Sequence, residues 1–336
     1  MTAKIKPSKG APYARILGVG GYRPTRVVPN EEILKYIDSS DEWIRTRSGI
    51  TTRHWASPQE TVAEMSIEAA GKAIADAGLT VEDVDAVLVA TVSHFKQTPA
   101  IATEIAHRLG TGKPPAFDIS AGCAGFTYGL TLAKGMVTEG SAKYVLVIGV
   151  ERLSDLTDKE DRATAFLFGD GAGAVVVGPS DVPAIGPTVW GSEGDKAETI
   201  KQTLPWDVYR AANPEDIRFP AITQEGQAVF RWAVYEMAKV AQEALDAAGI
   251  TSDELDAFIP HQANMRIIDS MIKALKLPEH VAVARDIETT GNTSSASIPL
   301  AMERLLATGQ AKSGDTALVI GFGAGLVYAA SVVTLP

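Results

Sequence analysis

The sequence contains a single cysteine, Cys123, so no disulfide bond can form within the chain. This scarcity is typical of proteins in a reducing cytosol. Long hydrophobic runs are also missing, because the longest, such as Tyr144–Val150 and Ala317–Phe322, are far too short to cross a bilayer. Lysines occur near the N-terminus, but no apolar signal core follows them. We therefore expect a cytoplasmic protein that does not enter a membrane.

An excess of basic residues is absent as well. The chain has 31 Lys and Arg against 41 Asp and Glu, a net charge of −10, which disfavours nucleic-acid binding but leaves room for a local basic patch. The glycine clusters lack the Gly-x-Gly-x-x-Gly register, no Walker sequence occurs, and no His/Cys/carboxylate spacing suggests zinc. We expect neither nucleotide hydrolysis nor a metal ion.

What is present is an alternation of helical and strand patterns in a chain that is 46% hydrophobic. Hydrophobic spacing and turn residues predict a sequence of α/β units. The expected strands cover 14–20, 84–91, 116–120, 144–150 and 174–178, and the expected helices cover 60–77, 99–109 and 126–137.

The second half of the chain repeats the order of the first. Ala73–Leu88 matches Ala244–Ile259 position for position, and the residues before Cys123 have a counterpart before Asn292. Such ordered matches indicate a duplicated α/β unit, with halves at 1–180 and 181–336. The alternative is that the matches reflect only the residue preferences shared by all helix–turn–strand units, without duplication.

The helix after Cys123 has no charged residue over Ala124–Ala133, which predicts burial on every face. Its glycines at positions 122, 125 and 129 predict close helix–helix approach. The segment Pro183–Pro220 is rich in Gly, Pro, Trp and charge, and we expect loops there over the entrance to a site.

Cys123 is the first candidate for chemistry. It stands after a predicted strand and tight turn and opens the buried helix. At a helix N-terminus the unpaired N–H groups favour thiolate over thiol. The alternative is a structural cysteine in the core, since apolar burial raises the pKa of a thiol and leaves it unreactive.

His261 and Asn292 are the other candidates. Pro260 should end a strand and present His261 at the carboxyl edge of the sheet, where open α/β sheets place their sites. Asn292 stands after a predicted strand and before a helix over 298–307, where it would otherwise serve as a turn or cap residue. Its match to Cys123 in the repeat favours a functional role.

These motifs resemble the β-ketoacyl-acyl carrier protein synthase III family over nearly the whole chain. The matching segments are Asp41–Ile50, Asp118–Phe126, Phe168–Gly173, Pro260–Ile268, Gly291–Ser297 and Phe322–Gly325. The resemblance implies a thiolase-type five-layered αβαβα fold and a homodimer. It also implies a catalytic triad of Cys123, His261 and Asn292, with acyl-CoA and acyl carrier protein as partners and no separate cofactor.

By the same resemblance, an acyl group carried on Cys123 is joined to malonyl-acyl carrier protein by decarboxylation, and the N–H groups of Cys123 and Ala324 form the oxyanion hole. Further roles implied by the resemblance are CoA binding by Trp43, Arg47, Arg162 and Asn264, carrier-protein docking by Arg231, Gln262, Arg266 and Lys273, and an acyl pocket at Thr98 and Phe322.

Two positions depart from the family pattern. Ala324 replaces a frequent glycine, which would be costly if that backbone requires positive φ. Thr98 stands where acetyl-preferring members carry Phe, so the smaller side chain predicts room for branched or longer primers.

Three other functions compete with condensation. Cysteine peptidases can share the chain order Cys, His, Asn, but their local sequence differs and the repeat is not expected. A non-condensing acyltransferase remains open, although the complete triad disfavours it. A non-catalytic scaffold would have no need of the three residues together.

Overall fold

The computed structural model describes residues 5–213, 215 and 217–336. The strands are β1 (Tyr13–Tyr22), β2 (Arg26–Pro29), β3 (Thr52–Trp55), β4 (Ala86–Ala90), β5 (Ala116–Ile119), β6 (Val145–Arg152), β7 (Asp170–Ser180), β8 (Val189–Ser192), β9 (Ile200–Gln202), β10 (Ile222–Gln224), β11 (Ala257–Pro260), β12 (Ala282–Val283), β13 (Thr316–Gly323) and β14 (Val327–Thr334). The α-helices are α1 (Asn30–Ile33), α2 (Asp41–Ser48), α3 (Val62–Asp76), α4 (Ile101–Leu109), α5 (Gly125–Glu139), α6 (Trp206–Ala211), α7 (Gly226–Ala248), α8 (Met265–Leu275), α9 (Ile287–Thr290) and α10 (Ser297–Ala307).

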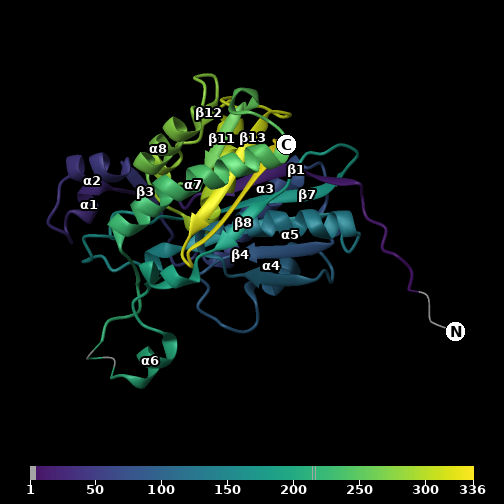
Figure 1. Cartoon of the computed structure of the whole chain (residues 1–336). Helices are drawn as coiled ribbons and strands as arrows, with labels where there is room; N and C mark the ends of the chain where they lie inside the picture. The colour runs from purple at the N-terminus through teal and green to yellow at the C-terminus, as the bar shows by residue number, and fades with distance from the viewer. Residues whose placement is uncertain (1–4, 214, 216) are drawn as a thin grey trace.

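Two five-stranded sheets form the centre of the molecule (Figure 1). One has the strand order β1-β7-β6-β4-β5 and the other the order β8-β14-β13-β11-β12. In both, the first three strands in these orders are antiparallel neighbours and the last three are parallel neighbours. The shared order confirms the duplication that the sequence predicts.

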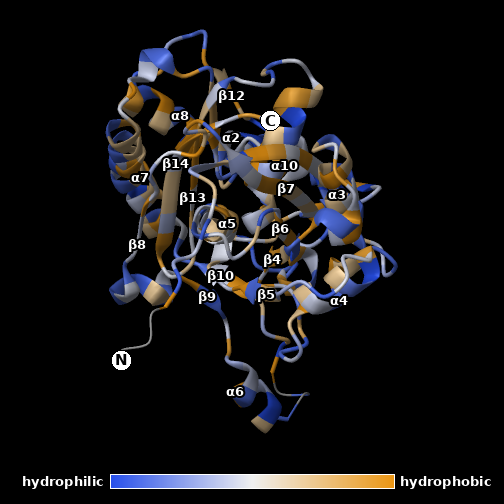
Figure 2. Cartoon of the chain, turned by 90° about the vertical axis from the view of Figure 1, so that its right-hand side faces the viewer, coloured by the Kyte–Doolittle hydropathy of each residue, from blue (hydrophilic) through white to orange (hydrophobic). Residues whose placement is uncertain are grey.

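Helices cover both sheets and fill the space between them. Helices α3 and α4 pack on the first sheet, α7 and α8 lie on the outer side of the second, and α5 and α10 contact strands of both sheets. This gives the predicted αβαβα layering. Figure 2 shows hydrophobic colour concentrated on the strands and on the helix surfaces that face them. Hydrophobic burial between the layers is the main force that holds such an arrangement together.

The central helix α5 has the all-round burial near its start that its uncharged sequence predicts. Phe126 and Leu130 are buried in the core shared by the two sheets, together with Ile298 and Met302 of α10. The matched turns of the repeat are also alike, since Thr80 with Asp83 and Thr251 with Glu254 form equivalent capping boxes.

Two local expectations were wrong. Asn292 follows the short helix α9 rather than a strand, because the strand of that unit, β12, is only two residues long. The segment 183–220 is not loop throughout: it contains β8, which completes the second sheet, and also β9 and α6. Helix α6 projects away from the body of the molecule (Figure 1).

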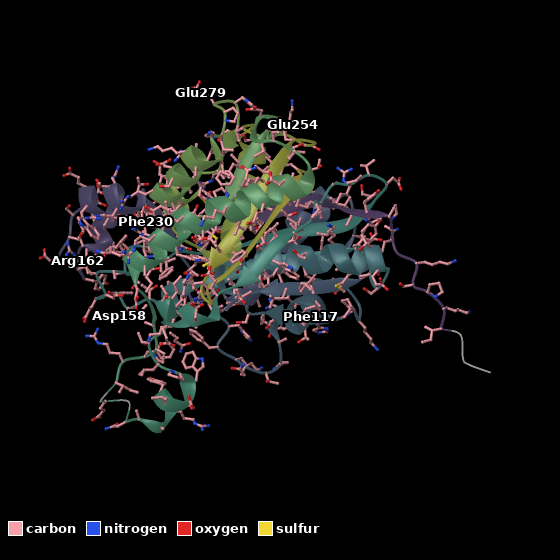
Figure 3. All side chains as sticks on the ribbon, in the orientation of Figure 1. Phe117, Asp158, Arg162, Phe230, Glu254 and Glu279 are labelled. Carbon is pink, nitrogen blue, oxygen red and sulfur yellow. The ribbon has the colours of Figure 1, made fainter. Side chains whose placement is uncertain are left out.

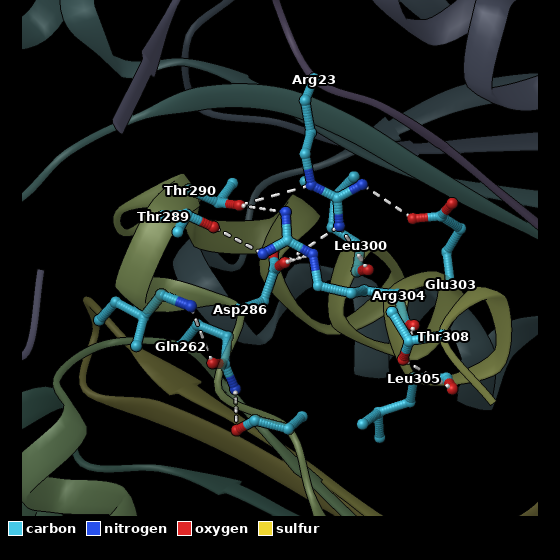
Figure 4. A network of polar contacts seen from close by, with 12 residues as sticks. Arg23, Gln262, Asp286, Thr289, Thr290, Leu300, Glu303, Arg304, Leu305 and Thr308 are labelled. Carbon is cyan, nitrogen blue, oxygen red and sulfur yellow. Dashed lines mark hydrogen bonds and ion pairs between the residues drawn. The ribbon is translucent and has the colours of Figure 1, made fainter. Parts of the chain in front are cut away.

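A network of ion pairs centred on the buried Asp286 joins the halves. Arg23, which follows β1, contacts Asp286 and Glu303, and Asp286 also contacts Arg304 of α10 (Figure 4). Within the described residues, none of the helices is both long and apolar enough to cross a membrane.

Candidate active site

A cavity of about 1230 Å³ opens between the two halves. Cys123, His261 and Asn292 all line it, although they are far apart in the sequence. The duplicated topology explains the meeting, because Cys123 precedes α5 in one half and Asn292 precedes α10 in the other. His261 follows β11 and so lies at the carboxyl end of a parallel strand, as Pro260 predicts.

Cys123 lies in a 3₁₀ turn, Gly122–Ala124, that leads directly into α5. The Ser294 hydroxyl and the backbone N–H groups of Cys123 and Ala324 are close enough to the sulfur to lower the pKa of the thiol. Gly323 lies against it, since a Cβ at that position would be 2.9 Å from the sulfur. The sulfur is therefore enclosed by groups from both halves.

The charge state of Cys123 differs from the sequence expectation. Burial raises the pKa of the Cys123 thiol to about 12, and the Glu151 carboxylate acts in the same direction. The hydrogen bonds from Ser294 and from the two N–H groups lower the pKa, but they do not offset the loss of hydration. The resting group is therefore a thiol.

His261 is buried, with 2% of its surface exposed, and its backbone N–H donates to the Ile320 carbonyl at 2.7 Å. Burial lowers the pKa of His261 to about 3, so the imidazole is neutral at pH 7. Its Nδ1 lies 2.7 Å from the Ser297 hydroxyl oxygen, and Phe322 packs edge-on against the ring with 5.4 Å between centroids.

Asn292 is held on both sides of its backbone by the Leu167–Gly169 segment. Its side-chain oxygen accepts the Ser294 N–H at 2.8 Å. Because Oδ1 is engaged there, the amide nitrogen Nδ2 is on the opposite side of the group and is available as a donor. Ser294 has a left-handed φ of 48°, so this contact depends on a backbone conformation that costs free energy for a non-glycine residue.

The Ala324 N–H lies near the Cys123 sulfur, where it lowers the pKa of the thiol. Among the described residues, the non-glycine positions with positive φ are Lys276 and Ser294. The backbone at Ala324 therefore does not require glycine. The conformational strain that positive φ would impose on alanine at this position is absent.

Sequence reasoning missed Glu151, a fully buried carboxyl group behind Cys123. Its oxygens accept hydrogen bonds from the Ser93 hydroxyl and the Val92 N–H, and its Oε1 lies 3.1 Å from the Ser295 hydroxyl oxygen. Burial raises the pKa of Glu151 to about 7 in spite of these donors. It links the loop after β4 to the loop that carries Asn292, and its place directly after the expected strand 144–150 is the sequence signal that could have found it.

The residues predicted to bind CoA meet at one end of the cavity. Arg162 lies with its guanidinium carbon 4.9 Å from the centre of the Trp43 ring, and Arg47 lies 5.8 Å from the same ring. Asn264 caps α8 by accepting the Arg266 N–H, and its amide donates to the Arg47 carbonyl. Arg162 and Phe230 lie on one side of the molecule in Figure 3, near α2, whereas Phe117 lies lower and closer to the centre.

Three of the four predicted docking residues are exposed. Arg231, Arg266 and Lys273 reach the surface of α7 and α8, and the Arg266 guanidinium lies 4.7 Å from the centre of the Phe230 ring. Gln262 contradicts the prediction, because it is 1% exposed. Its amide bonds the carbonyls of Pro260 and Ala284 and accepts the Ile287 N–H, so it cannot contact another protein.

The two residues predicted to form the acyl pocket differ in position. Phe322 lines the cavity beside His261, but Thr98 is exposed and is not among the lining residues. The pocket wall comes instead from neighbours such as Val92 and Ala100, and from Phe117 of β5. From the 183–220 segment, Ile200–Gln202 and Trp206 border the cavity, as expected for a segment over its entrance.

Comparison with known proteins agrees with this architecture. The family model described as 3-oxoacyl-[acyl-carrier-protein (ACP)] synthase III matches residues 117–194, and its C-terminal counterpart matches residues 245–335. A protein of Streptomyces glaucescens named beta-ketoacyl-[acyl-carrier-protein] synthase III is 82% identical over 334 residues, 99% of this chain and 100% of that one.

Solved structures are similar over the full length. A priming beta-ketosynthase from a polyketide biosynthetic pathway has a TM-score of 0.95 and 47% identity, covering 100% of this chain and 99% of its own. The 3-oxoacyl-[acyl-carrier-protein] synthase III of Aquifex aeolicus has a TM-score of 0.87 and 39% identity, covering 96% of this chain and 99% of its own.

Proposed function

This chain belongs to the β-ketoacyl-[acyl-carrier-protein] synthase III family, and we propose that Cys123, His261 and Asn292 carry out its condensation of an acyl-CoA primer with malonyl-acyl carrier protein. The observation that carries the proposal is the shared cavity, to which one half contributes a thiol and the other two neutral hydrogen-bond donors. The arrangement needs no redox cofactor, because loss of CO2 generates the carbon nucleophile.

Acyl transfer comes first. The Cys123 sulfur attacks the thioester carbonyl of the primer, and the N–H groups of Cys123 and Ala324 stabilise the oxyanion. The carbon–sulfur bond to CoA breaks, and the thiol proton ends on the CoA sulfur. The products are an acyl-Cys123 thioester and free CoA, so a thiol with a raised pKa is compatible with the net reaction.

Condensation follows when malonyl-acyl carrier protein occupies the cavity. The bond to the carboxylate carbon breaks, CO2 leaves, and the electron pair forms an enolate whose oxygen is stabilised by His261 and Asn292 N–H groups. The enolate carbon attacks acyl-Cys123, forming the new carbon–carbon bond and releasing the Cys123 sulfur. The sulfur takes up one proton, and the product is a 3-oxoacyl-acyl carrier protein.

The CoA and carrier-protein roles are proposals on the same basis. The Trp43 ring, with the guanidinium groups of Arg47 and Arg162 nearby, suits an adenine ring next to phosphates. Among the described residues, Arg231, Arg266 and Lys273 form no ion pair with an acidic side chain, unlike Arg45, Arg108 and Arg218. They would give a protein of net charge −10 a local basic surface for an acidic partner.

We also propose a cytoplasmic homodimer. β5 is an edge strand of the first sheet, and its Phe117 is 40% exposed. An exposed apolar edge strand is a natural pairing surface for a second copy. Sedimentation velocity would report a mass near twice 35.5 kDa, and a monomer at micromolar concentration would refute this.

Mass spectrometry of the products tests the proposed function. The protein is incubated with malonyl-acyl carrier protein and either acetyl-CoA or isobutyryl-CoA. A 3-oxoacyl carrier protein formed with loss of CO2, and absent in Cys123→Ala, is the expected result. The cavity volume leads us to expect product from both primers. An acylated Cys123 without carbon–carbon bond formation would instead indicate a non-condensing acyltransferase, and strict acetyl preference would reject the branched-primer proposal.

A further inference from the structure

Ser297 is the first residue of α10 and is 1% exposed. Its hydroxyl oxygen contacts two groups: His261 Nδ1 at 2.7 Å and the Gln262 backbone nitrogen at 3.3 Å. Both contacts cross from α10 to the end of β11. The hydroxyl therefore lies at the buried edge of the imidazole, behind the face that lines the cavity.

The proton positions in this contact follow from what each group can do. A backbone N–H only donates, so Gln262 N–H uses a lone pair of the Ser297 oxygen. The single hydrogen of the hydroxyl then has one acceptor among its two contacts, His261 Nδ1. A nitrogen that accepts a hydrogen bond carries no proton, so in a neutral imidazole the proton is on Nε2.

The surrounding chain keeps this contact in place. The Gln262 side chain bonds the Pro260 and Ala284 carbonyls and the Ile287 N–H, which fixes the end of β11 against the α9 segment. The backbone N–H of His261 bonds the Ile320 carbonyl at 2.7 Å. The buried glutamine misassigned to docking thus has a structural role one residue from the imidazole.

We propose that Ser297 is a positioning residue that holds His261 as the Nε2–H tautomer, so that the imidazole donates a hydrogen bond to the substrate. This inference rests on the proposed role of His261 in condensation. It gives His261 the same function as Asn292, whose Oδ1 is occupied by the Ser294 N–H. Two N–H donors, each set by a serine of the same loop-and-helix segment, then face the thioester oxygen as it gains negative charge. No proton is transferred, and both donors recover their resting state when the enolate carbon has formed its bond.

The test compares Ser297→Ala with Ser66→Ala. Ser66 is also fully buried, and its hydroxyl donates to the Val62 carbonyl of α3, away from the cavity. Without the Ser297 donor, the imidazole can populate both tautomers. We expect acylation of Cys123 by primer-CoA to change less than about twofold in Ser297→Ala. Condensation should fall about 10- to 100-fold, less than the 10²–10³-fold typical of deleting a donor outright. Ser66→Ala should leave both steps unchanged.

A direct readout is ¹⁵N NMR of labelled histidine in the whole protein, with the His261 signals assigned from a His261→Asn variant. The wild type should show a protonated Nε2 and an unprotonated Nδ1, and Ser297→Ala a mixture. Ser297→Cys, which retains a weak donor, should recover part of the condensation rate. The proposal is overturned if Ser297→Ala keeps the wild-type tautomer, or if acylation and condensation fall together. If His261→Ala itself condenses at the wild-type rate, the proposed function of His261 fails instead, whatever the NMR result.

Discussion

His261 and Asn292 each have one polar atom that the protein engages and another that is left for substrate. Ser297 occupies Nδ1 of His261, and Ser294 occupies Oδ1 of Asn292. Neither contact can be derived from the family resemblance alone, because serines are common and the partners are set by backbone geometry. The residue types can be predicted from sequence, but their orientation cannot.

Glu151 leads to a prediction about stability and pH. Its ordinary carboxyl pKa of 4.5 is raised to about 7 in the folded protein. Between these values the native state keeps a proton that the unfolded chain has released, so stability falls as pH rises through this window. Glu151→Gln should lose this dependence. The free energy of unfolding of the variant, measured in urea, should therefore rise by about 3 kcal/mol relative to that of wild type between pH 4.5 and 7.5.

The substitution suits the site for a specific reason. The glutamine oxygen can accept from Ser93 and the Val92 N–H, while its amide donates to Ser295, whose hydroxyl donates to the Ala90 carbonyl at 2.8 Å. Asp170, with a pKa raised to about 6 by burial, is present in both proteins and cancels in the difference. Parallel stability curves for the two proteins would mean that Glu151 is ionised throughout this range.

At the scale of elements, periodicity predicts what is long and regular. α3 and α5 and the buried strands β4 and β6 lie where hydrophobic spacing places them, within a few residues. The wrong expectation at Asn292 concerned short elements, since α9 has four residues and β12 has two, too few to show a hydrophobic period. Thr98 and Gln262 were misplaced for another reason, because a motif match carries no information about which way a side chain faces.

The glycines of α5 differ in what they pack against. We expected close helix–helix contact, but a Cβ at Gly125 would lie 2.8 Å from Ala90 Cβ on β4, so the close contact is between helix and sheet. Gly125→Ala should cost about 1–3 kcal/mol, since neither backbone can move freely. Gly135 lies on the same helix, and a Cβ added there would meet no atom within 4 Å, so Gly135→Ala should stabilise by up to about 1 kcal/mol. Equal effects in denaturant unfolding would disprove the close contact.

The whole molecule depends on the two halves holding a fixed relation, because Cys123 comes from one half and His261 and Asn292 from the other. The shared core around α5 and α10 supplies most of the contact between them. A repeated sequence predicts two similar halves, but it does not predict which polar side chains join them. Arg23 and Asp286 are 263 residues apart, and no sequence pattern pairs them.

The ion network between the halves provides the test at this scale (Figure 4). Asp286 is 2% exposed in its side chain, and its Oδ1 accepts from Arg304 Nε at 2.7 Å and Arg23 Nη2 at 3.1 Å. Asp286→Ala removes the buried counter-ion shared by Arg304, which is partly exposed, and Arg23, which keeps its pair with Glu303, so we expect a loss of about 3 kcal/mol in the free energy of unfolding. Glu160→Ala removes an exposed partner of the exposed Arg218 and should cost less than about 1 kcal/mol. A similarly small loss in the free energy of unfolding for Asp286→Ala would show that the hydrophobic core alone fixes the relative position of the halves. A large loss in stability, with condensation failing at a correspondingly lower temperature, would tie this distant network to the meeting of Cys123 with His261 and Asn292.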